Sequence, residues 1–514
     1  MFKWLGGGGG KSDHPLADAK RAKEIADEIS AAEPVKALAE ATEWLESINQ
    51  AADFKIESRV NAIELVDMAA RKLQQKVLDD YFTVGVDNKF QENRIHAAAT
   101  KYWKTLGDAY MQCVAQIETA KSISSELKPR VPVVVARGLR ALTQHLKWVQ
   151  FRYGKIEADC WKNISTLLKH AEAGGIVEHR IELYPGMAPA TSVRNEFLRV
   201  MMLWAASPGS LSPLKQDVVE WVAGHFADKF LLPPRPEAEF IYYFDLGKSS
   251  PPQRWTRQTP VNPAARYFDA GEALLAVKSL ADSTAAVGAL PSGVDLGPSR
   301  NMDIVVEVLR HLVTNWARAL PVRASEWRDT AMQLSVVHSF EVVVGAIAPE
   351  LGDGLDFTEA LAHETWVAEN VSQGGYGAVV PAGKDDWVKV GVLIGVKNEK
   401  ETTWSVGLIR RVKSDDYKQR RVGIQLVSRI ALPIQLRSSG AGGRPHRAIL
   451  LNAEPSASGS MHVLVPHNAF TLRDNIVGMY GKDNERRCTL KPAGVLETGP
   501  DFIWARFIAE FNLG

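Results

Sequence analysis

A short polar turn in the second half of the chain carries side chains and backbone groups suited to ligand binding. Asn370, Ser372 and Gly375 form the pattern Asn-x-Ser-x-x-Gly, and Gly374 doubles the glycine. Such a turn exposes backbone N–H groups, and its glycines let a flat or anionic ligand approach the backbone closely. Ordinary hairpin turns use the same residue types, so a purely structural role is the alternative interpretation.

Arginines lie on both sides of this turn. Arg318, Arg323 and Arg328 recur at intervals of five residues before it, and Arg410 and Arg411 follow it. Guanidinium groups form paired hydrogen bonds with phosphate oxygens, bond to the O6/N7 edge of guanine and stack on bases. Residues 401–450 hold ten Lys or Arg and three Asp or Glu, whereas residues 351–370 hold five acids and no Lys or Arg. The arginines are therefore candidates for an anionic ligand, or else form a solvated sheet edge.

Six strand-like runs surround the turn and would have to position these residues. Each run is apolar and rich in β-branched or aromatic residues, and polar or glycine-containing stretches separate most of them. The runs cover residues 335–345, 366–371, 376–380, 387–396, 402–412 and 421–428. The polar turn connects the second and third runs. We therefore expect a small sheet or barrel with this turn at one end.

The motif and the strand order together resemble the PilZ domains, bacterial receptors for the dinucleotide cyclic di-GMP. In that family Asp/Asn-x-Ser-x-x-Gly lies at the turn between two strands of a six-stranded barrel, and a pair of arginines precedes the barrel. The last run, Arg-Val-Gly-Ile-Gln-Leu-Val-Ser at 421–428, is similar to the strand that closes such barrels. The resemblance covers residues 318–430, about a fifth of the chain.

The resemblance implies cyclic di-GMP as the ligand, with no cofactor and no metal. Its implied ligand-binding residues are Arg323, Arg328, Asn370, Ser372, Gly374 and Gly375, with Arg318, Arg410 and Arg411 as additional candidates. Arg323 and Arg328 would hold the phosphates and guanine edges, and the turn would seat the base and ribose. The family spacing is Arg-x-x-x-Arg, and the spacing here is one residue longer.

The bulk composition indicates an ordinary multidomain protein. The chain has 514 residues, 46% of them hydrophobic and 24% charged, and its net charge of +1 creates no general field for a nucleic acid polymer. Its three cysteines form no metal-ligand spacing and suggest a reducing compartment. The apolar N-terminal stretch is too short for a signal peptide, and no run approaches the ~18 apolar residues of a membrane span. We therefore expect a cytoplasmic protein without membrane insertion.

Apolar residues at intervals of three and four predict helices over most of the first half of the chain. Further helices are expected at 193–206, 212–230, 264–285 and 302–320, and strands at 176–184 and 239–246. After a glycine- and serine-rich linker at 437–444, five strand-like runs follow, at 447–451, 461–465, 476–480, 487–490 and 502–507.

These expectations define a multidomain α+β chain: a long all-α N-terminal region, a PilZ-like six-stranded β-barrel and a second small β unit. The expected segments are a flexible tail at 1–14, a helical bundle at 15–175, a mostly helical middle domain at 176–320, the barrel at 321–435 and the C-terminal β domain at 445–514.

Three functions are compatible with this organisation. The first is a cyclic di-GMP effector that changes the arrangement of its barrel against the helical region and regulates a protein partner in motility, biofilm formation or secretion. The second is an adaptor that keeps the fold, binds no nucleotide and acts through protein contacts of the helical region. The third, an enzyme, has no support from the residues: His363-Glu364 lacks the second histidine of a zinc-protease helix, and no Gly-x-Ser-x-Gly elbow occurs.

Overall fold

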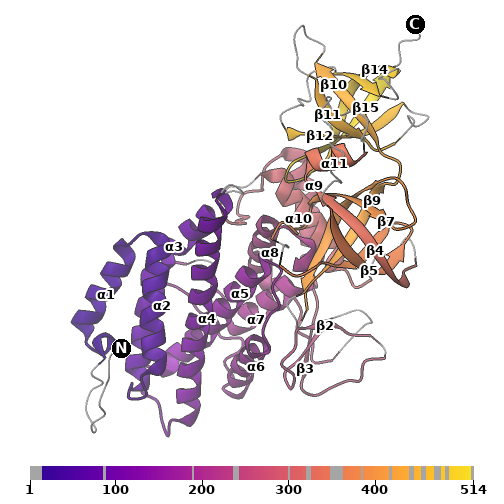
Figure 1. Cartoon of the computed structure of the whole chain (residues 1–514). Helices are drawn as coiled ribbons and strands as arrows, with labels where there is room; N and C mark the ends of the chain where they lie inside the picture. Colours follow the sequence, from indigo (N-terminus) through magenta and orange to yellow (C-terminus); the bar gives the residue numbers. More distant parts are fainter. Residues whose placement is uncertain are drawn as a thin grey trace. The chain divides into compact units, whose positions relative to one another are not determined.

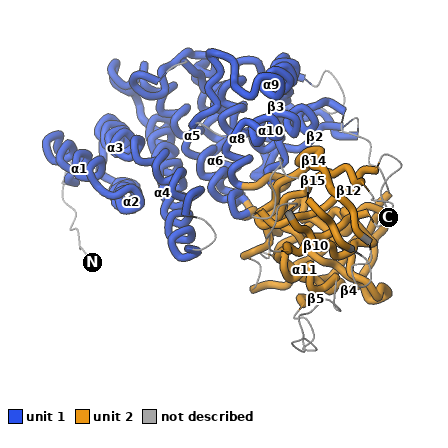
Figure 2. Tube along the Cα trace, turned by 90° about the horizontal axis from the view of Figure 1, so that it is seen from above, with its two compact units in different colours: residues 1–152, 156–208, 213–321 blue, residues 153–155, 209–212, 322–514 orange. Residues whose placement is uncertain are grey.

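The chain forms two compact units (Figure 2). The computed structural model describes residues 14–84, 88–187, 190–235, 242–256, 258–298, 301–319, 326–347, 363–383, 386–415, 419–438, 445–452, 459–467, 476–480 and 486–510. Unit 1 comprises residues 1–152, 156–208 and 213–321, and unit 2 comprises residues 153–155, 209–212 and 322–514. Unit 1 therefore includes both the predicted helical bundle and the predicted middle domain. The predicted tail at 1–14 lies almost entirely outside the described residues.

Unit 1 is mainly helical, as the sequence predicts (Figure 1). Its first helices are α1 (Ala19–Ala31), α2 (Pro34–Gln50), α3 (Ile56–Thr83), α4 (Lys89–Thr119), α5 (Val131–Gln150) and α6 (Ala158–Ala173). After a non-helical segment come α7 (Val193–Ala205) and α8 (Pro213–His225). A three-stranded sheet of β1 (Tyr242–Asp245), β2 (Gln253–Arg254) and β3 (Ala265–Phe268) precedes α9 (Ala273–Val287) and α10 (Met302–Asn315).

Helix α5 is the centre of unit 1, since α4, α6, α7 and α8 all pack against it. A proline in its first turn favours helix initiation there, because proline fixes a helical φ and lacks an N–H that would have no intrahelical partner. Almost every residue of α5 is buried, including the charged Arg137, Arg140 and Lys147. Buried charges of this kind require ion-pair partners, because their desolvation is costly.

The carboxylate partners of Arg140 and Lys147 come from α7 and α8, whereas Arg137 donates from Nε to Leu183 O at 2.8 Å and its Nη1 lies 3.9 Å from Asp67 Oδ2 of α3. Both oxygens of Glu196 accept hydrogen bonds from Arg140, at 2.7 and 2.9 Å. Lys147 Nζ donates to Asp217 Oδ1 at 2.7 Å and to Glu220 Oε2 at 3.3 Å, and Arg199 Nε donates to Glu220 Oε1 at 2.6 Å. These pairs tie α5 to α7 and α8 and compensate the charges within the unit.

Two predicted elements of unit 1 differ in the structure. Residues 176–184 form no strand, and only the single bridge Ile181–Thr191 occurs there. The predicted helix at 264–285 begins later, because residues 265–268 pair with β1 as strand β3. Within the described residues, no helix combines the length and apolar character that a membrane span needs.

The first barrel of unit 2 is closed and antiparallel, with the strand order β4-β5-β6-β9-β8-β7. Its strands are β4 (Arg328–His338), β5 (Glu364–Ser372), β6 (Gly375–Val379), β7 (Leu393–Asn398), β8 (Ser405–Ser414) and β9 (Arg420–Ser428). Alternating residues fill the interior, among them Leu334, Trp366, Ala378, Ile409 and Ile424. The predicted six-stranded barrel is therefore confirmed.

One predicted strand is partly wrong. The run at 335–345 starts in β4, but the chain leaves the sheet at Ser339, whose φ is +73°, and continues as helix α11 (Phe340–Ile347). A positive φ is incompatible with a continuous strand. The helix packs Phe340, Val343 and Val344 against residues of both barrels, including Leu393 and Ile449.

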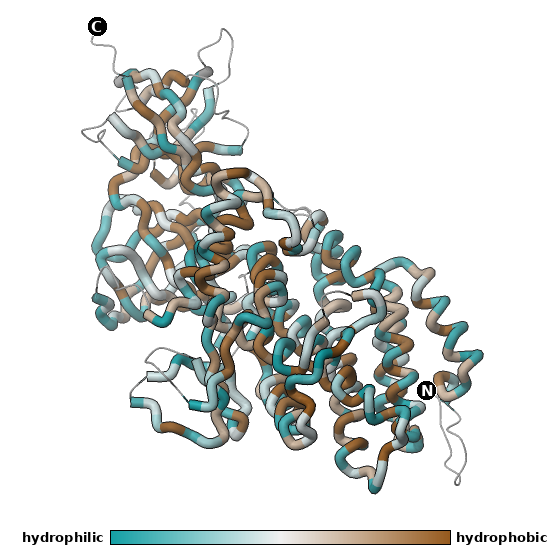
Figure 3. The backbone as a smooth tube through the Cα atoms, turned by 180° about the vertical axis from the view of Figure 1, so that it is seen from behind, coloured by the Kyte–Doolittle hydropathy of each residue, from teal (hydrophilic) through white to brown (hydrophobic). Residues whose placement is uncertain are grey.

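The C-terminal β unit is a second closed six-stranded barrel, with the order β10-β11-β12-β15-β14-β13. Its strands are β10 (Leu432–Ser438), β11 (His446–Leu450), β12 (Ser460–Val465), β13 (Ile476–Tyr480), β14 (Arg486–Thr498) and β15 (Ile503–Glu510). Five of them match the predicted runs, whereas β10 was not predicted, and its last two residues fall in the predicted linker. The strands of both barrels carry hydrophobic as well as hydrophilic residues (Figure 3).

The β5–β6 hairpin depends on Gly375 for close packing. A Cβ atom at this residue would lie 1.8 Å from the backbone oxygen of Ile424 in β9, whereas a Cβ at Gly374 would meet nothing within 4 Å. The backbone oxygen of Gly374 also accepts a hydrogen bond from Leu426 N at 2.8 Å. The turn is therefore held against β9 by its backbone.

We predict that Gly375→Ala destabilises the first barrel by roughly 3 kcal/mol, because the methyl group forces β6 and β9 apart. Hydrogen exchange of the β6 and β9 amides in the full chain measures this as faster exchange. Gly374→Ala is the matched control and should exchange like the wild type. Equal protection in the two variants would contradict this account of the hairpin.

The charge network around α5 makes unit 1 sensitive to acid. Burial by itself would raise the pKa of Glu220, but the Arg199 and Lys147 charges outweigh it and lower this pKa from 4.5 to about 2. Folding thus favours the ionised form of Glu220. The contribution of this carboxylate to the free energy of unfolding is present above pH 4.5 and is lost as the pH falls towards 2.

We predict that protonation of Glu220 lowers the free energy of unfolding of unit 1 by about 3 kcal/mol between pH 4.5 and 2. Urea unfolding, followed by the helical circular dichroism signal at several pH values, measures it. In Glu220→Gln, proton uptake on unfolding in this range should be smaller by about one proton. The same pH dependence in this variant and the wild type would show that Glu220 is not the group responsible.

Candidate ligand-binding site

Four strands of the first barrel bring one row of residues together on its outer surface. In the strand register, Asn370 of β5 lies opposite Gly377 of β6, Gly377 opposite Gly423 of β9, and Gly423 opposite Arg411 of β8. The neighbouring row, with Ala378, Val422 and Val412, belongs to the barrel core. Since successive residues of a strand point to opposite faces, the Asn370–Arg411 row faces outward.

The two glycines give this row a floor without side chains. A Cβ at Gly377 would lie 2.3 Å from Asn370 Oδ1, so the asparagine side chain occupies the space above this glycine. A Cβ at Gly423 would meet only the Cβ of Arg411, at 3.4 Å. The surface is therefore open between the asparagine and the arginine, where a ligand can approach the backbone.

A cavity of about 510 Å³ lies over this floor. Its lining residues are Trp327, Glu369, Asn370, Gly377, Ala378, Arg411, Lys413, Arg421, Val422 and Gly423. We call it the barrel cavity. Trp327 immediately precedes β4, and 41% of its surface is exposed. An exposed indole at the edge of a polar cavity offers a face on which a base can stack.

The electrostatics of the barrel cavity follow from which of its charges are already paired. Arg421 Nη1 lies 2.9 Å from Glu369 Oε2, so this acid is compensated locally. Within the described part of the chain, no ion pair holds Arg411 or Lys413. Three cations and one carboxylate line the cavity. The surplus of two positive charges suits a ligand with two negative charges.

Of the sequence-predicted candidates that the structure describes, Asn370 and Arg411 line the barrel cavity. Arg328 is the first residue of β4, is exposed and lies opposite Val371, next to the signature residues. Ser372 is buried and, like the turn glycines Gly374 and Gly375, does not line the cavity. Arg323 lies outside the described residues.

Two of the additional candidates have other partners. Arg318 belongs to unit 1, where its Nε lies 3.1 Å from Asp269 Oδ2. Arg410 donates from Nη2 to Glu497 Oε2 at 2.8 Å and from Nε to Gln425 Oε1 at 2.7 Å. Glu497 lies on β14, so Arg410 links the first barrel to the second rather than lining the cavity.

Several cavity residues were missed from the sequence, namely Trp327, Gly377, Lys413 and Gly423. Lys413 follows Arg411 by two residues, and Gly377 follows Gly375 by two. The alternation of a strand could therefore have assigned each to the same face as its predecessor. For Trp327 the sequence signal is an aromatic residue directly before the candidate Arg328. The pairing of Gly377 with Gly423 depends on a cross-strand register that no local pattern contains.

The six-stranded barrel with Asn-x-Ser-x-x-Gly at the end of two paired strands defines this part of the chain as a PilZ domain. Sequence comparison agrees, since residues 358–433 match the family described as the cyclic-di-GMP receptor FimW, middle PilZ domain.

Residues 20–236 match the N-terminal domain of the same receptor, and the two matches together span more than half of the chain. The chain belongs to the FimW family of cyclic-di-GMP receptors. The matched PilZ region begins before β5 and ends in β10, so β4 precedes it. No curated protein matches the chain.

Proposed function

We propose that this protein binds cyclic di-GMP in the barrel cavity and that binding changes the arrangement of the barrel against the helical region to regulate a protein partner. The proposal rests on two cations, Arg411 and Lys413, for which the described residues provide no ion-pair partner. They lie beside the glycine floor and the signature Asn370. The family membership supports the same ligand.

Each part of the ligand has a chemical counterpart in the barrel cavity. The two phosphodiester groups match the surplus of two cations, and Arg411 and Lys413 supply donors for their oxygens. Asn370 offers an amide that can donate to and accept from a guanine edge. Trp327 provides a stacking face at the rim. A purine can approach the backbone over Gly377 and Gly423 because neither glycine has a side chain.

The residues before β4 connect ligand binding to regulation. Trp327 and Arg328 lie where the chain enters the first barrel from the segment that follows unit 1. A ligand that stacks on Trp327 would restrain Trp327 and the adjacent Arg328 at the entrance to the barrel, which is a ligand-dependent switch. A change in the segment alters what the helical unit presents to a partner in motility, biofilm or secretion control. No chemical step is involved, so the protein acts as a receptor and not as an enzyme.

We predict that Arg411→Ala weakens cyclic di-GMP binding by about 10- to 100-fold, because a hydrogen bond to a charged group is worth about 1.5–3 kcal/mol. Arg328→Ala should weaken it by at most about fivefold, because an exposed charge pair is worth about 1 kcal/mol or less. Isothermal titration calorimetry on the full chain measures both. Arg506→Ala, an exposed arginine on β15 of the second barrel, is the control and should bind like the wild type.

The adaptor is the competing function. If the wild type and all variants give no heat and no shift in melting temperature with cyclic di-GMP, the receptor proposal fails and the adaptor remains. If the wild type binds and Arg411→Ala binds equally well, the receptor stands but the ligand lies elsewhere.

We also predict that Gly423→Val blocks binding without unfolding the barrel. Its Cβ meets only the Cβ of Arg411, at 3.4 Å, so the strand accepts a side chain, which then fills the cavity floor. The melting temperature should stay near that of the wild type while cyclic di-GMP affinity falls more than about tenfold. Gln333→Val, on an exposed position of β4 away from the cavity, controls for the added β-branched side chain.

A further inference from the structure

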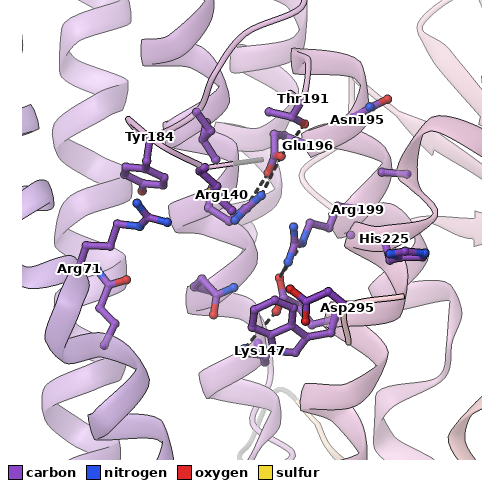
Figure 4. Close-up of a pocket in the computed structure, with 18 of the residues that line it drawn as sticks. Arg71, Arg140, Lys147, Tyr184, Thr191, Asn195, Glu196, Arg199, His225 and Asp295 are labelled. Atoms are coloured by element: carbon purple, nitrogen blue, oxygen red, sulfur yellow. Dashed lines mark hydrogen bonds and ion pairs between the residues drawn. The ribbon is translucent and has the colours of Figure 1, made fainter. Parts of the chain in front are cut away.

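Unit 1 contains a second and larger cavity, of about 680 Å³, that the proposed nucleotide site does not use. We call it the helical cavity. One wall is a face of α3 with Arg71, Gln74, Gln75 and Leu78, whose spacing of three and four residues places them on one side of the helix. The floor is α5, and the opposite wall comes from α7 and α8 (Figure 4).

The floor of the helical cavity is rigid and electrically balanced. Arg140 is paired with Glu196, Arg199 with Glu220, and Lys147 with both Asp217 and Glu220. These side chains are all buried. A Cβ at Gly224 would lie 2.5 Å from the guanidinium carbon of Arg199, so this glycine allows the guanidinium to lie against the backbone of α8. Buried ion pairs often stabilise a fold less than apolar residues of similar volume would. We therefore attribute these pairs to recognition of a specific ligand rather than to stability.

The charges that remain unpaired lie at opposite walls. Arg71 is stacked on Tyr184, with its guanidinium carbon 4.2 Å from the ring centroid. Figure 4 shows Arg71 and Tyr184 on one side of the cavity, and His225 and Asp295 on the other. Asp228, three residues after His225, lines the cavity too. In the described residues, neither Arg71 nor Asp228 has an ion-pair partner.

This distribution disfavours a polyanion. The lining includes five cations, counting Arg180 at the surface, and four carboxylates, so its net charge is small. A ligand with two negative charges would gain from Arg71 and Arg180 but would be repelled by Asp228 and Asp295. A ligand with one negative and one positive group gains at both walls.

The aromatic residues indicate what carries these two charges. Trp221, which is partly exposed, lines the same cavity together with the buried Trp103 and Trp148. Tryptophan, tyrosine and arginine are the residue types that dominate binding energy in protein–protein interfaces. A short peptide with apolar, acidic and basic side chains matches this combination better than a nucleotide does.

We propose that the helical cavity binds a short segment of a protein partner that carries an acidic side chain against Arg71 and a basic side chain against Asp228. This inference rests on the proposed function, since it names where the regulated partner meets the helical unit. The segment lies across α5, and its apolar residues contact the partly exposed Trp221.

The test uses the full chain and fluorescein-labelled synthetic hexapeptides. Each peptide carries one Glu and one Lys, in either order and at varied spacing, and reference peptides carry only one of the two charges. Fluorescence anisotropy should show that one order and spacing binds at least about tenfold more tightly than either singly charged reference. If no peptide binds at about 1 mM, or if binding is independent of charge order, the inference is overturned.

Charge reversal locates the site. Arg71→Glu should weaken the selected peptide by at least about tenfold, and Asp228→Lys should do the same. Lys72→Glu is the matched control, because Lys72 is exposed on the same helix, does not line the cavity and carries the same charge. A peptide in which the Glu is replaced by Lys should regain affinity for Arg71→Glu. Equal losses in Arg71→Glu and Lys72→Glu would overturn the inference.

Cyclic di-GMP titration of the same variants keeps the two proposals distinguishable. Arg71→Glu should bind the nucleotide like the wild type, and its helical circular dichroism signal, which comes mainly from unit 1, shows whether the variant is folded. If it does not fold, Arg71→Gln replaces it. Charge-dependent peptide binding without nucleotide binding leaves this inference intact and removes the receptor proposal. Nucleotide binding without charge-dependent peptide binding leaves the receptor proposal intact and removes this inference.

Discussion

The absence of side chains at two paired strand positions is the constraint on which the rest of the first barrel depends. Gly377 and Gly423 lie opposite each other on β6 and β9, with Asn370 and Arg411 at the two ends of the same row. A larger residue at Gly377 would collide with the Asn370 side chain. The glycines therefore both position the signature asparagine and keep the surface beside it open to a flat ligand.

The distribution of charge around this row follows from local irregularities in the sheet. The pairing of β8 with β9 shifts between Ile409 and Arg411, so Arg410 occupies a bulge. A bulge redirects the side chains of neighbouring residues. Arg410 is accordingly paired with Glu497 of the second barrel, while Arg411 lines the cavity. In the pairing of β5 with β6, Glu369 lies at a similar shift and is neutralised by Arg421. The sheet thus separates structural ion pairs from cations that are available to a ligand.

The fold was largely predictable because its signals are local. Apolar runs rich in β-branched or aromatic residues identified most strands of both barrels, and apolar intervals of three and four identified most helices. Helix α11 was missed because Phe-Glu-Val-Val-Val is as typical of a strand as of a helix, and the break at Ser339 depends on a backbone angle. Strand β10 was missed because Pro433 interrupts its β-prone pattern.

The site was less predictable than the fold. The signature asparagine and Arg411 were recognisable by residue type and motif, but Gly377, Lys413 and Gly423 acquire their role only through the register of β6, β8 and β9. Gly375, which the motif marks as a ligand residue, is explained by its contact with β9. Likewise, neither cavity of this chain is encoded in a contiguous motif, because each is assembled from elements distant in sequence.

A crystal structure of the full chain with cyclic di-GMP tests the central claim most directly. The account predicts ligand density over Gly377 and Gly423, with the phosphates near Arg411 and Lys413 and a guanine against Trp327. Density on another face of the first barrel, on the second barrel or in the helical unit, with the barrel cavity empty, would contradict it.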